Sequence, residues 1–334
     1  MKTGSPAPLE GSPYLGPLTE HDGAIFSLAC SPDGRWMASG DFLGIIRLWD
    51  IRSTKASSLV LRQRSNDSTR SVSALVFADK GRTLVSGDNN GRLYWWDALS
   101  GKLLGESKTH RDGITALVAC GSDGSRVASG SHDGSIRFWN PQKREAVESP
   151  LAPLGPLGLP MVLGLASSLD GRLLAAGYDA GSVRLWDTIT GHLIKGWELG
   201  DPRVNDVAFS PDGERLAIAT HDNTVRILEA ATGRQAELFR TNMQPWHLAY
   251  APSGRELAVG MQGAESGPAL GGVRVWDLEN LRTDGRPLEG ASRINALVYE
   301  PQENLIIAAG EYSIHRWHGE RQGPSLAKAV SVDF

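Results

Sequence analysis

Short apolar runs separated by polar, glycine-containing turns make up almost the whole chain. Runs such as "AIFSLAC" (24–30), "SVSALVF" (71–77) and "RVNDVAF" (203–209) are each followed by a turn and then by a second apolar run. The first leads into "SPDG" (31–34), and an Asp-Gly turn between two short apolar, β-branched runs is typical of a β-hairpin. The pattern therefore predicts strands that follow one another through tight turns.

A third run closes each unit, in most cases on a tryptophan followed by an acid. "GIIRLWD" (44–50), "GRLYWWD" (91–97) and "GSVRLWD" (181–187) show this ending, and seven related endings lie 41 to 48 residues apart. A fourth, weaker strand follows, as in "GKLLGES" (101–107). Such a period is typical of four-stranded propeller blades. One such sheet cannot bury both of its faces alone, so the blades are expected to stack radially and close into a ring.

These repeats resemble those of the WD40-repeat family over residues 20–318. The resemblance implies an all-β fold, a seven-bladed β-propeller of four-stranded antiparallel blades, as a single domain over 1–334. The blades are expected at approximately 20–65, 66–109, 110–157, 158–199, 200–241, 242–289 and 290–334. Closure needs a terminal strand in blade seven. Residues 12–18 are favoured because the spacing to the next strand matches that of residues 101–113, and residues 325–334 are the alternative.

The stretch "SHDGSIRFWNP" (131–141) raises the question of a catalytic or metal site, but the family resemblance implies architecture. Blade three carries a His, a Ser, an Asp and a Trp that in this family form a buried polar network: His110, Ser129, Asp133 and Trp139. The network fixes the imidazole and gives the indole N–H a partner. His132 has no place in it. Blade one has His21, Ser39 and Trp49, but Leu43 stands where the turn Asp is expected.

Composition narrows the class of protein without naming a partner. Hydrophobic residues make up 40% of the chain and charged residues 22%, which is typical of a globular protein, and the net charge of −4 gives no general attraction to nucleic acid. No apolar run approaches the ~18 residues of a membrane helix. Two cysteines and an N-terminus without the features of a secretory signal favour a reducing, cytoplasmic setting.

No motif predicts chemistry. "GSDGSRVASGSHDG" (121–134) lacks the Lys of a phosphate-binding loop, and neither H-E-x-x-H, C-x-x-C nor G-x-S-x-G occurs. The inner strands offer Asp206 as their one carboxylate. The sequence therefore predicts no catalytic residues, no metal site and no cofactor.

The resemblance does imply where a partner would bind. Two positions in each blade commonly contact peptides on the face where the central channel opens. One is the residue just after the first apolar residue of the inner strand: Phe26, Ser73, Thr115, Leu163, Asn205, Trp246 and Asn295. The other precedes the turn Asp: Phe42, Asn89, His132, Asp179 and His221. Arg203 and Arg293 precede two of the inner strands, so an acidic flank on the peptide is expected.

We therefore expect a non-catalytic scaffold or sensor that binds a protein or peptide on the channel face, as a monomeric propeller or as part of a larger complex or chain. The alternatives are a propeller enzyme of hydrolase or lactonase type and a nucleic-acid-binding propeller. Three segments depart from the repeat: a glycine-rich insertion (261–272) over the channel face, a basic segment (52–70) and a proline-rich connector (148–160). The last two read as parts of the solvated rim.

Overall fold

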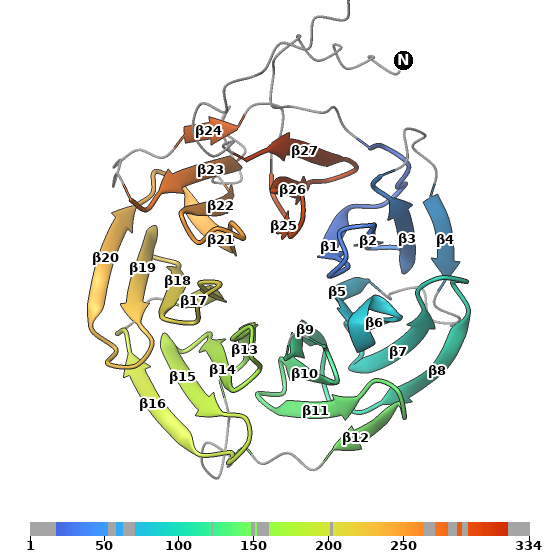
Figure 1. The fold of residues 1–334 in the computed structure, drawn as a ribbon, viewed down its shortest axis with the longest axis horizontal. Coiled ribbons are helices and arrows are strands. Elements are labelled where there is room, and N and C mark those ends of the chain that lie inside the picture. Colours follow the sequence, from blue (N-terminus) through green and yellow to red (C-terminus); the bar gives the residue numbers. More distant parts are fainter. Residues whose placement is uncertain are drawn as a thin grey trace, which may run out of the picture.

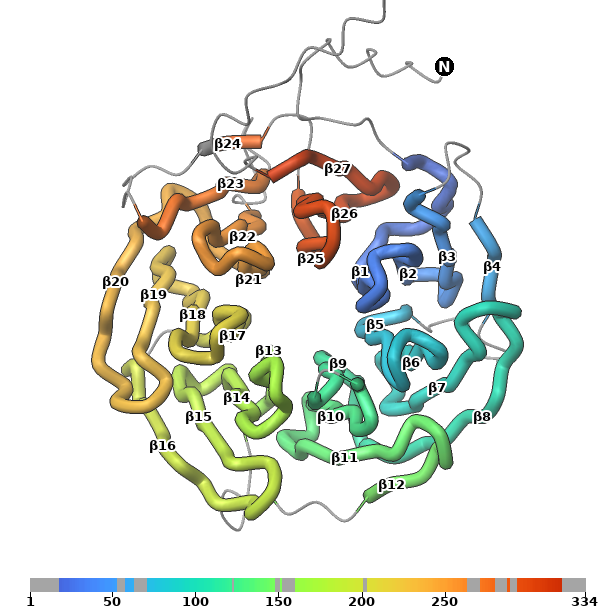
Figure 2. Tube along the Cα trace, in the orientation of Figure 1, coloured from blue at the N-terminus to red at the C-terminus, as the bar shows by residue number. Residues whose placement is uncertain are grey.

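Seven antiparallel sheets surround a central axis (Figures 1 and 2). The computed structural model describes residues 18–52, 58–62, 71–121, 123–147, 151, 160–200, 203–262, 271–279, 286–288 and 293–319. The predicted all-β fold and the seven-bladed β-propeller are confirmed. The expected limits of the individual blades stay a prediction. No helix in the described part of the chain is both long and apolar enough to cross a membrane.

Within each blade, successive strands pair in sequence order, and the first strand lies nearest the channel (Figure 1). Blades one to three consist of β1 (Ile25–Cys30), β2 (Trp36–Asp41), β3 (Ile45–Asp50) and β4 (Ser58–Arg62); β5 (Val72–Ala78), β6 (Thr83–Asp88), β7 (Arg92–Asp97) and β8 (Leu103–Lys108); and β9 (Ile114–Cys120), β10 (Arg126–Ser131), β11 (Ile136–Asn140) and β12 (Glu145–Val147). A 3-10 turn, η1 (Asp79–Gly81), links β5 to β6.

The remaining blades follow the same plan. They consist of β13 (Val162–Ser167), β14 (Leu173–Tyr178), β15 (Ser182–Asp187) and β16 (Leu193–Glu198); β17 (Val204–Phe209), β18 (Arg215–Thr220), β19 (Thr224–Glu229) and β20 (Gln235–Arg240); β21 (Gln244–Tyr250), β22 (Glu256–Gln262), β23 (Gly271–Asp277) and β24 (Arg286–Leu288); and β25 (Ala296–Glu300), β26 (Leu305–Ala309) and β27 (Ile314–His318).

The apolar core lies between neighbouring blades. Met37 and Trp49 of blade one pack in a single cluster with Ile307 and Ile314 of blade seven. Complete burial of a side chain such as Ile307 stabilises the fold by ~1.5–3 kcal/mol. Because each interface has this form, the stability of a blade depends on both of its neighbours.

The N-terminal side of the described chain pairs with the last blade. Leu18 and Ile314 exchange two backbone hydrogen bonds, each 2.9 Å long, and Leu18 is buried in the cluster between blades seven and one. This pairing places Leu18 on the outer edge of β27, where a fourth strand belongs. The rest of the predicted closing strand, residues 12–17, and the alternative, residues 325–334, lie outside the described residues.

The departures from the repeat fall at the edges of blades. In blade six, β22 and β23 stay paired up to Gln262 and Gly271, and the rest of the predicted insertion lies outside the described residues. The basic segment 52–70 contributes β4, which pairs with β3 along its whole length. Of the connector 148–160, only Leu151 and Pro160 are described.

Candidate functional site

The polar network of blade three has the geometry of a buried structural element. The Ser129 hydroxyl lies 2.7 Å from Nε2 of His110 and accepts the indole N–H of Trp139 at 2.8 Å. Nδ1 of His110 lies 3.0 Å from the Ser135 hydroxyl and 3.4 Å from a carboxylate oxygen of Asp133. Each polar atom of His110 and the Trp139 indole thus has a partner.

Protonation in this network follows from burial and hydrogen bonding. Burial lowers the pKa of His110, and this outweighs the attraction of the Asp133 carboxylate. Burial opposes ionisation of Asp133, but hydrogen bonds from Ser135 and from the backbone N–H of Arg111 outweigh it and hold the pKa of Asp133 at about 2. The neutral imidazole of His110 and the carboxylate of Asp133 both bond to groups inside the protein. These bonds fix the orientation of the turn between β10 and β11.

Blade one contains a second network of this type, which reasoning from the sequence missed. Asp41, at the end of β2, lies 2.8 Å from Nδ1 of His21, while Nε2 of His21 lies 2.7 Å from Ser39. Ser39 also accepts the indole N–H of Trp49 at 2.8 Å. The acid therefore stands two residues before the Leu43 position. The shared "SGD" of residues 39–41 and 86–88 is the signal that could have found it.

Other blades keep only part of the network. In blade two, Trp96 donates to Ser86 at 3.0 Å, and the Tyr94 hydroxyl, 3.3 Å from Asp88, stands in for the histidine. The indole N–H groups of Trp186 and Trp276 find no partner among the described residues. These blades rely on apolar packing around the indole.

No cluster of metal ligands occurs among the described residues, because no three His, Cys, Asp or Glu side chains gather there. Of the two thiols, that of Cys120 is buried and that of Cys30 is partly buried. Burial raises the pKa of Cys120 to about 11 and raises that of Cys30 further. The thiolate is the reactive form of cysteine, and raised pKa values leave little of it at neutral pH.

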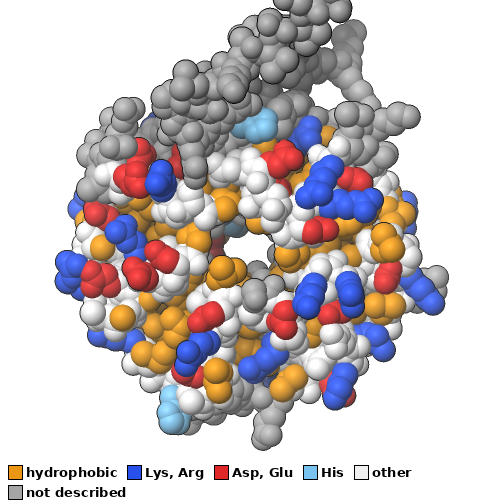
Figure 3. Space-filling model, viewed as in Figure 1, with side chains coloured by type: hydrophobic (Ala, Val, Ile, Leu, Met, Phe, Trp, Pro, Cys, Tyr) orange, Lys and Arg blue, Asp and Glu red, His pale blue; other side chains and the backbone are white. Residues whose placement is uncertain are grey.

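The central channel brings together five of the predicted partner-binding residues. It contains a cavity of about 210 Å³, and a space-filling view shows the opening bordered by hydrophobic side chains (Figure 3). The second residues of five inner strands line it: Phe26, Ser73, Thr115, Leu163 and Asn205. The corresponding residues of blades six and seven, Trp246 and Asn295, are not part of this lining.

Three of these channel residues also join neighbouring blades. Ser73 donates to the Ile114 carbonyl at 2.5 Å, Thr115 to that of Val162 at 2.7 Å, and Asn205 to that of Pro245 at 2.8 Å. Each acceptor is the first apolar residue of the inner strand, or its equivalent, in the next blade. The hydroxyl groups of Ser73 and Thr115 and the amide nitrogen of Asn205 therefore already bond across the blade interfaces, whereas Oδ1 of Asn205 has no hydrogen-bond partner among the described residues.

Trp246 and the two predicted arginines are held by internal contacts. The indole N–H of Trp246 donates to Gln244 at 3.1 Å, and the guanidinium of Arg203 lies 5.1 Å from the centre of the indole ring. Arg293 forms an ion pair with Glu311 at 3.6 Å, and both side chains are about half exposed. Asn295 accepts a hydrogen bond from Gln262 at 3.4 Å.

The predicted turn positions differ in exposure. Asp179 caps the adjacent segment by accepting the backbone N–H of Met161 at 2.8 Å. His132 and His221 are exposed, and the structure assigns their side chains no hydrogen bond among the described residues. Phe42 is 50% exposed and forms an edge-on pair with Phe26, with ring centres 6.1 Å apart.

The exposed apolar side chains of the channel face concentrate at the junction of blades seven and one. Phe26 is 39% exposed, Leu43 57% and Tyr312 55%. The backbone N–H of Ile25 donates to the Gly310 carbonyl at 3.3 Å, which brings the turn with Tyr312 beside β1. The four residues Phe26, Phe42, Leu43 and Tyr312 are called the apolar sector below. Sequence reasoning missed Tyr312 because the β26–β27 turn is shorter than the others.

The residues that follow Phe26, Ser73, Thr115, Leu163, Asn205, Trp246 and Asn295 form another layer of the channel wall. This layer consists of Ser27, Ala74, Ala116, Gly164, Asp206, His247 and Ala296. Five of the seven side chains are small, and the two ionisable ones stand on adjacent strands, β17 and β21. In this layer, the channel wall is polar where β17 and β21 contribute Asp206 and His247. The small residues of the other strands leave open space in front of these two side chains.

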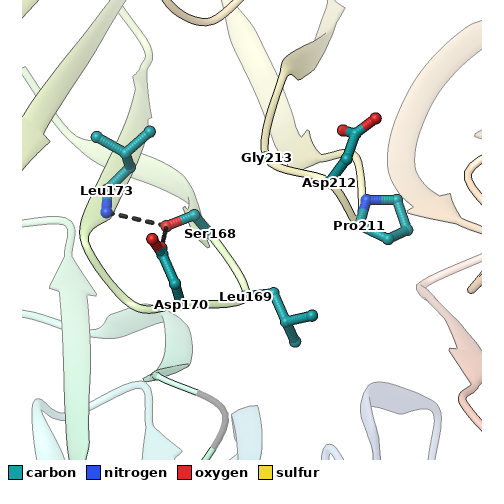
Figure 4. A pocket seen from close by; sticks show the side chains of 7 residues that line it. All are labelled: Ser168, Leu169, Asp170, Leu173, Pro211, Asp212 and Gly213. Carbon is teal, nitrogen blue, oxygen red and sulfur yellow. Dashed lines mark hydrogen bonds between the residues drawn. The ribbon is translucent and has the colours of Figure 1, made fainter.

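A second hollow, of about 460 Å³, lies between the β13–β14 and β17–β18 turns, with Leu169 and Pro211 on its walls (Figure 4). Its polar groups serve the turns themselves. Ser168 donates to Asp170 at 2.6 Å and accepts the backbone N–H of Leu173 at 2.9 Å. The same bonds recur at Ser210 in blade five and at Ser31 in blade one. The polar groups in this hollow therefore belong to a hydrogen-bond pattern that recurs in the turns of other blades.

Seven blades with tryptophan-ended repeats and buried His–Ser–Asp–Trp networks define the class of WD40-repeat propellers, and this chain is a WD40-repeat protein. The model of the WD domain, G-beta repeat, matches residues 13–50, 60–97, 101–140 and 158–187. The model of the anaphase-promoting complex subunit 4 WD40 domain matches residues 197–251.

Individual relatives are distant. The guanine nucleotide-binding protein subunit beta of Oryza sativa subsp. indica is 31% identical over 124 residues, which cover 36% of this chain and 33% of the relative. Protein tipD of Dictyostelium discoideum is 24% identical over 90% of this chain and 48% of its own length. The matches thus span a third to a half of these relatives. The β-propeller domain of Cps50 (Swd1) from Myceliophteria thermophila shares the fold, with a TM-score of 0.74, 16% identity and coverage of 92% of this chain and 99% of that chain.

Proposed function

We propose that this propeller is a non-catalytic interaction module that binds a peptide segment of a protein partner on its channel face. The observation that carries the proposal is the apolar sector. Phe26, Phe42, Leu43 and Tyr312 are each more than a third exposed and lie on two adjacent blades. Exposed apolar side chains that cluster next to an opening are typical of an interaction site.

The composition of the apolar sector suits a peptide anchor. Aromatic rings offer large contact areas at a low cost in conformational entropy, and the Tyr312 phenol adds a polar group. The edge-on contact of Phe26 with Phe42 fixes the two rings relative to each other. A partner side chain that covers them therefore meets a preorganised surface.

Two arginines at the edge of the channel face favour one charge on the bound peptide. Arg203 stacks on Trp246 and Arg293 pairs with Glu311, so two guanidinium groups stand near the ends of the β17 and β25 strands. They support an acidic flank on the peptide. The names of similar proteins, a guanine nucleotide-binding protein subunit and an anaphase-promoting complex subunit, agree with a role within an assembly.

A peptide selection tests the proposal. Random peptides displayed on phage are selected on the immobilised protein, and an enriched peptide is titrated against Phe26→Ala, Phe42→Ala and Tyr312→Ala. Each substitution is expected to weaken binding by ~1–3 kcal/mol, as truncation of anchor residues does. Lys80→Ala and Glu214→Ala, both exposed in turns on the opposite face, serve as matched controls and are expected to bind normally.

Two results would contradict the proposal. If only the opposite-face variants Lys80→Ala and Glu214→Ala lost binding, the peptide would bind on the other face of the propeller and not on the channel face proposed here. Tight binding of single-stranded DNA or RNA that weakens steeply with salt, in place of peptide binding, would favour the nucleic-acid class.

A further inference from the structure

Asp206 is a carboxylate in the channel wall without a positive partner. One oxygen accepts the backbone N–H of Val207 at 2.8 Å, and the other accepts that of Leu248, on the neighbouring β21, at 2.9 Å. No Lys, Arg or His of the described chain forms an ion pair with it. A carboxylate that borders open space but lacks a counter-charge favours a cationic ligand.

The surroundings of Asp206 leave space and supply a second polar group. His247 holds the equivalent position on β21, one residue before Leu248, and lines the same cavity. On the other side, Gly164 of β13 accommodates the carboxylate, because a Cβ there would lie 2.9 Å from Oδ1. Across the channel the corresponding residues are Ser and Ala. The cavity of about 210 Å³ is smaller than the ~300 Å³ at the lower end of small-molecule pockets, so it suits a single side chain.

We propose that Asp206 and His247 form a binding site for a basic side chain, lysine or arginine, which the peptide partner inserts into the channel. This proposal rests on the proposed function and specifies the chemistry of its ligand. The carboxylate pairs with the ammonium or guanidinium group, and the imidazole provides a further hydrogen bond. Phe26 at the channel lining and the leucines of the next layer, such as Leu165, contact the aliphatic stem.

The protonation of both groups gives the site a specific pH dependence. Burial raises the pKa of Asp206 to about 7, although the two backbone N–H groups oppose it. Burial lowers the pKa of His247 to about 4, so the imidazole is neutral at physiological pH and does not repel a cation. A cation binds the ionised carboxylate, and the ionised fraction grows as the pH rises through 7. Affinity is therefore expected to increase about tenfold between pH 6 and pH 8.

Other ionisable groups near β17 do not provide this dependence. β13 has none, β14 has Tyr178, and β18 has Arg215 at the end remote from Val204. β21 has Tyr250 besides His247, and burial raises the pKa of both tyrosines, which stay neutral. Arg203, which precedes β17, is held over Trp246.

A pair of small probes tests the site without knowledge of the partner. Butylguanidinium is a cation, and butylurea is its neutral counterpart of the same shape. The carboxyl carbon of Asp206 and the His247 ring are followed by NMR while each probe is added at pH 6 and pH 8. Butylguanidinium is expected to lower the pKa of Asp206 and to bind about tenfold more tightly at pH 8, whereas butylurea has neither effect.

Variants assign the effect to the residue. Asp206→Asn keeps a side-chain oxygen for one backbone N–H but removes the charge, and it is expected to weaken butylguanidinium binding about tenfold or more. Glu311→Gln removes an exposed carboxylate of the same face and is the matched control. Equal responses to both probes, or equal binding by wild type and Asp206→Asn, would overturn the site.

The experiment separates this inference from the proposed function. A selected peptide that depends on Phe26 and Phe42 but binds Asp206→Asn normally leaves the proposed function in place and overturns the cation site. If butylguanidinium binds at Asp206 but no peptide is enriched, the cation site stands and the proposed function is overturned. A selected peptide that loses affinity both on Asp206→Asn and on replacement of its own Lys or Arg by Gln supports both.

Discussion

Gly164 on β13 and Asp206 on β17 fit against each other across the interface of blades four and five. A Cβ at position 164 would lie 2.9 Å from both the Cα and Oδ1 of Asp206 and 3.1 Å from the Val207 nitrogen. Part of this neighbourhood is backbone, which cannot rotate out of the way. The absence of a side chain at position 164 therefore makes room for Asp206 in the channel wall.

Gly164→Ala is expected to destabilise the protein by ~1–3 kcal/mol, because the added methyl overpacks the interface. Urea denaturation measures the change. Gly105→Ala on β8 is the matched control, since its nearest contact is the flexible Arg144 side chain at 3.4 Å. If both variants unfold at the same urea concentration as the wild type, the close fit at Gly164 is not a constraint.

The two buried networks are expected to contribute similarly. His110→Ala and His21→Ala each leave a serine and an acid without their histidine partner, at a cost of ~1–3 kcal/mol. His132→Ala alters only an exposed side chain and is expected to be neutral. Urea denaturation of the three variants is the measurement. A cost for His132→Ala equal to that for His110→Ala would contradict the assignment.

The pH dependence of stability is expected to reveal Asp206 and His247 separately. Asp206 has a folded pKa of about 7 against ~3.9 in the unfolded chain, so the folded state retains a proton that the unfolded state releases, and stability falls as the pH rises from 4 to 7. His247 has a folded pKa of about 4 against ~6.5 unfolded, so stability rises over most of the same range. The two slopes oppose each other in the wild type.

Each single substitution removes one of the two opposing contributions to the pH dependence of stability. Asp206→Asn is expected to gain stability from pH 4 to 6.5, whereas His247→Gln is expected to lose ~1–3 kcal/mol from pH 4 to 7, less than the full shift because the channel admits water. The measurement is the free energy of unfolding at intervals of one pH unit. Parallel curves for wild type and both variants would show that neither group titrates as described.

Closure by the N-terminal segment is tested by truncation. Deletion of residues 1–19 removes the Leu18 pairing with Ile314 and exposes the edge of β27, so the protein is expected to aggregate. Deletion of residues 322–334 is expected to be milder. Light scattering during size-exclusion chromatography compares the two. An aggregating C-terminal deletion beside a monomeric N-terminal one would reverse the assignment of the closing strand.

The repeated endings on Trp49, Trp96 and Trp186 were sufficient to predict the propeller, because their period reflects one large buried side chain at the same place on the third strand of these blades. The repeat pattern predicted less about the buried networks and the channel. Asp41 takes the place of the acid expected at Leu43, because an acid at the end of the second strand can reach the same histidine. The fit of Gly164 to Asp206 joins residues of different blades, and a linear pattern gives no measure of that distance.

The acceptor role of Asp206 toward Leu248 makes one backbone amide a reporter of the channel. An ionised carboxylate is the stronger acceptor, and a cation bound in the channel keeps it ionised. Hydrogen exchange at the Leu248 amide is therefore expected to slow when a cation occupies the channel, while amides held only by strand pairing, such as that of Ile218, are expected to keep their rate. If the exchange rate changes in this way, transient separation of blades five and six is coupled to the contents of the channel through this single bond.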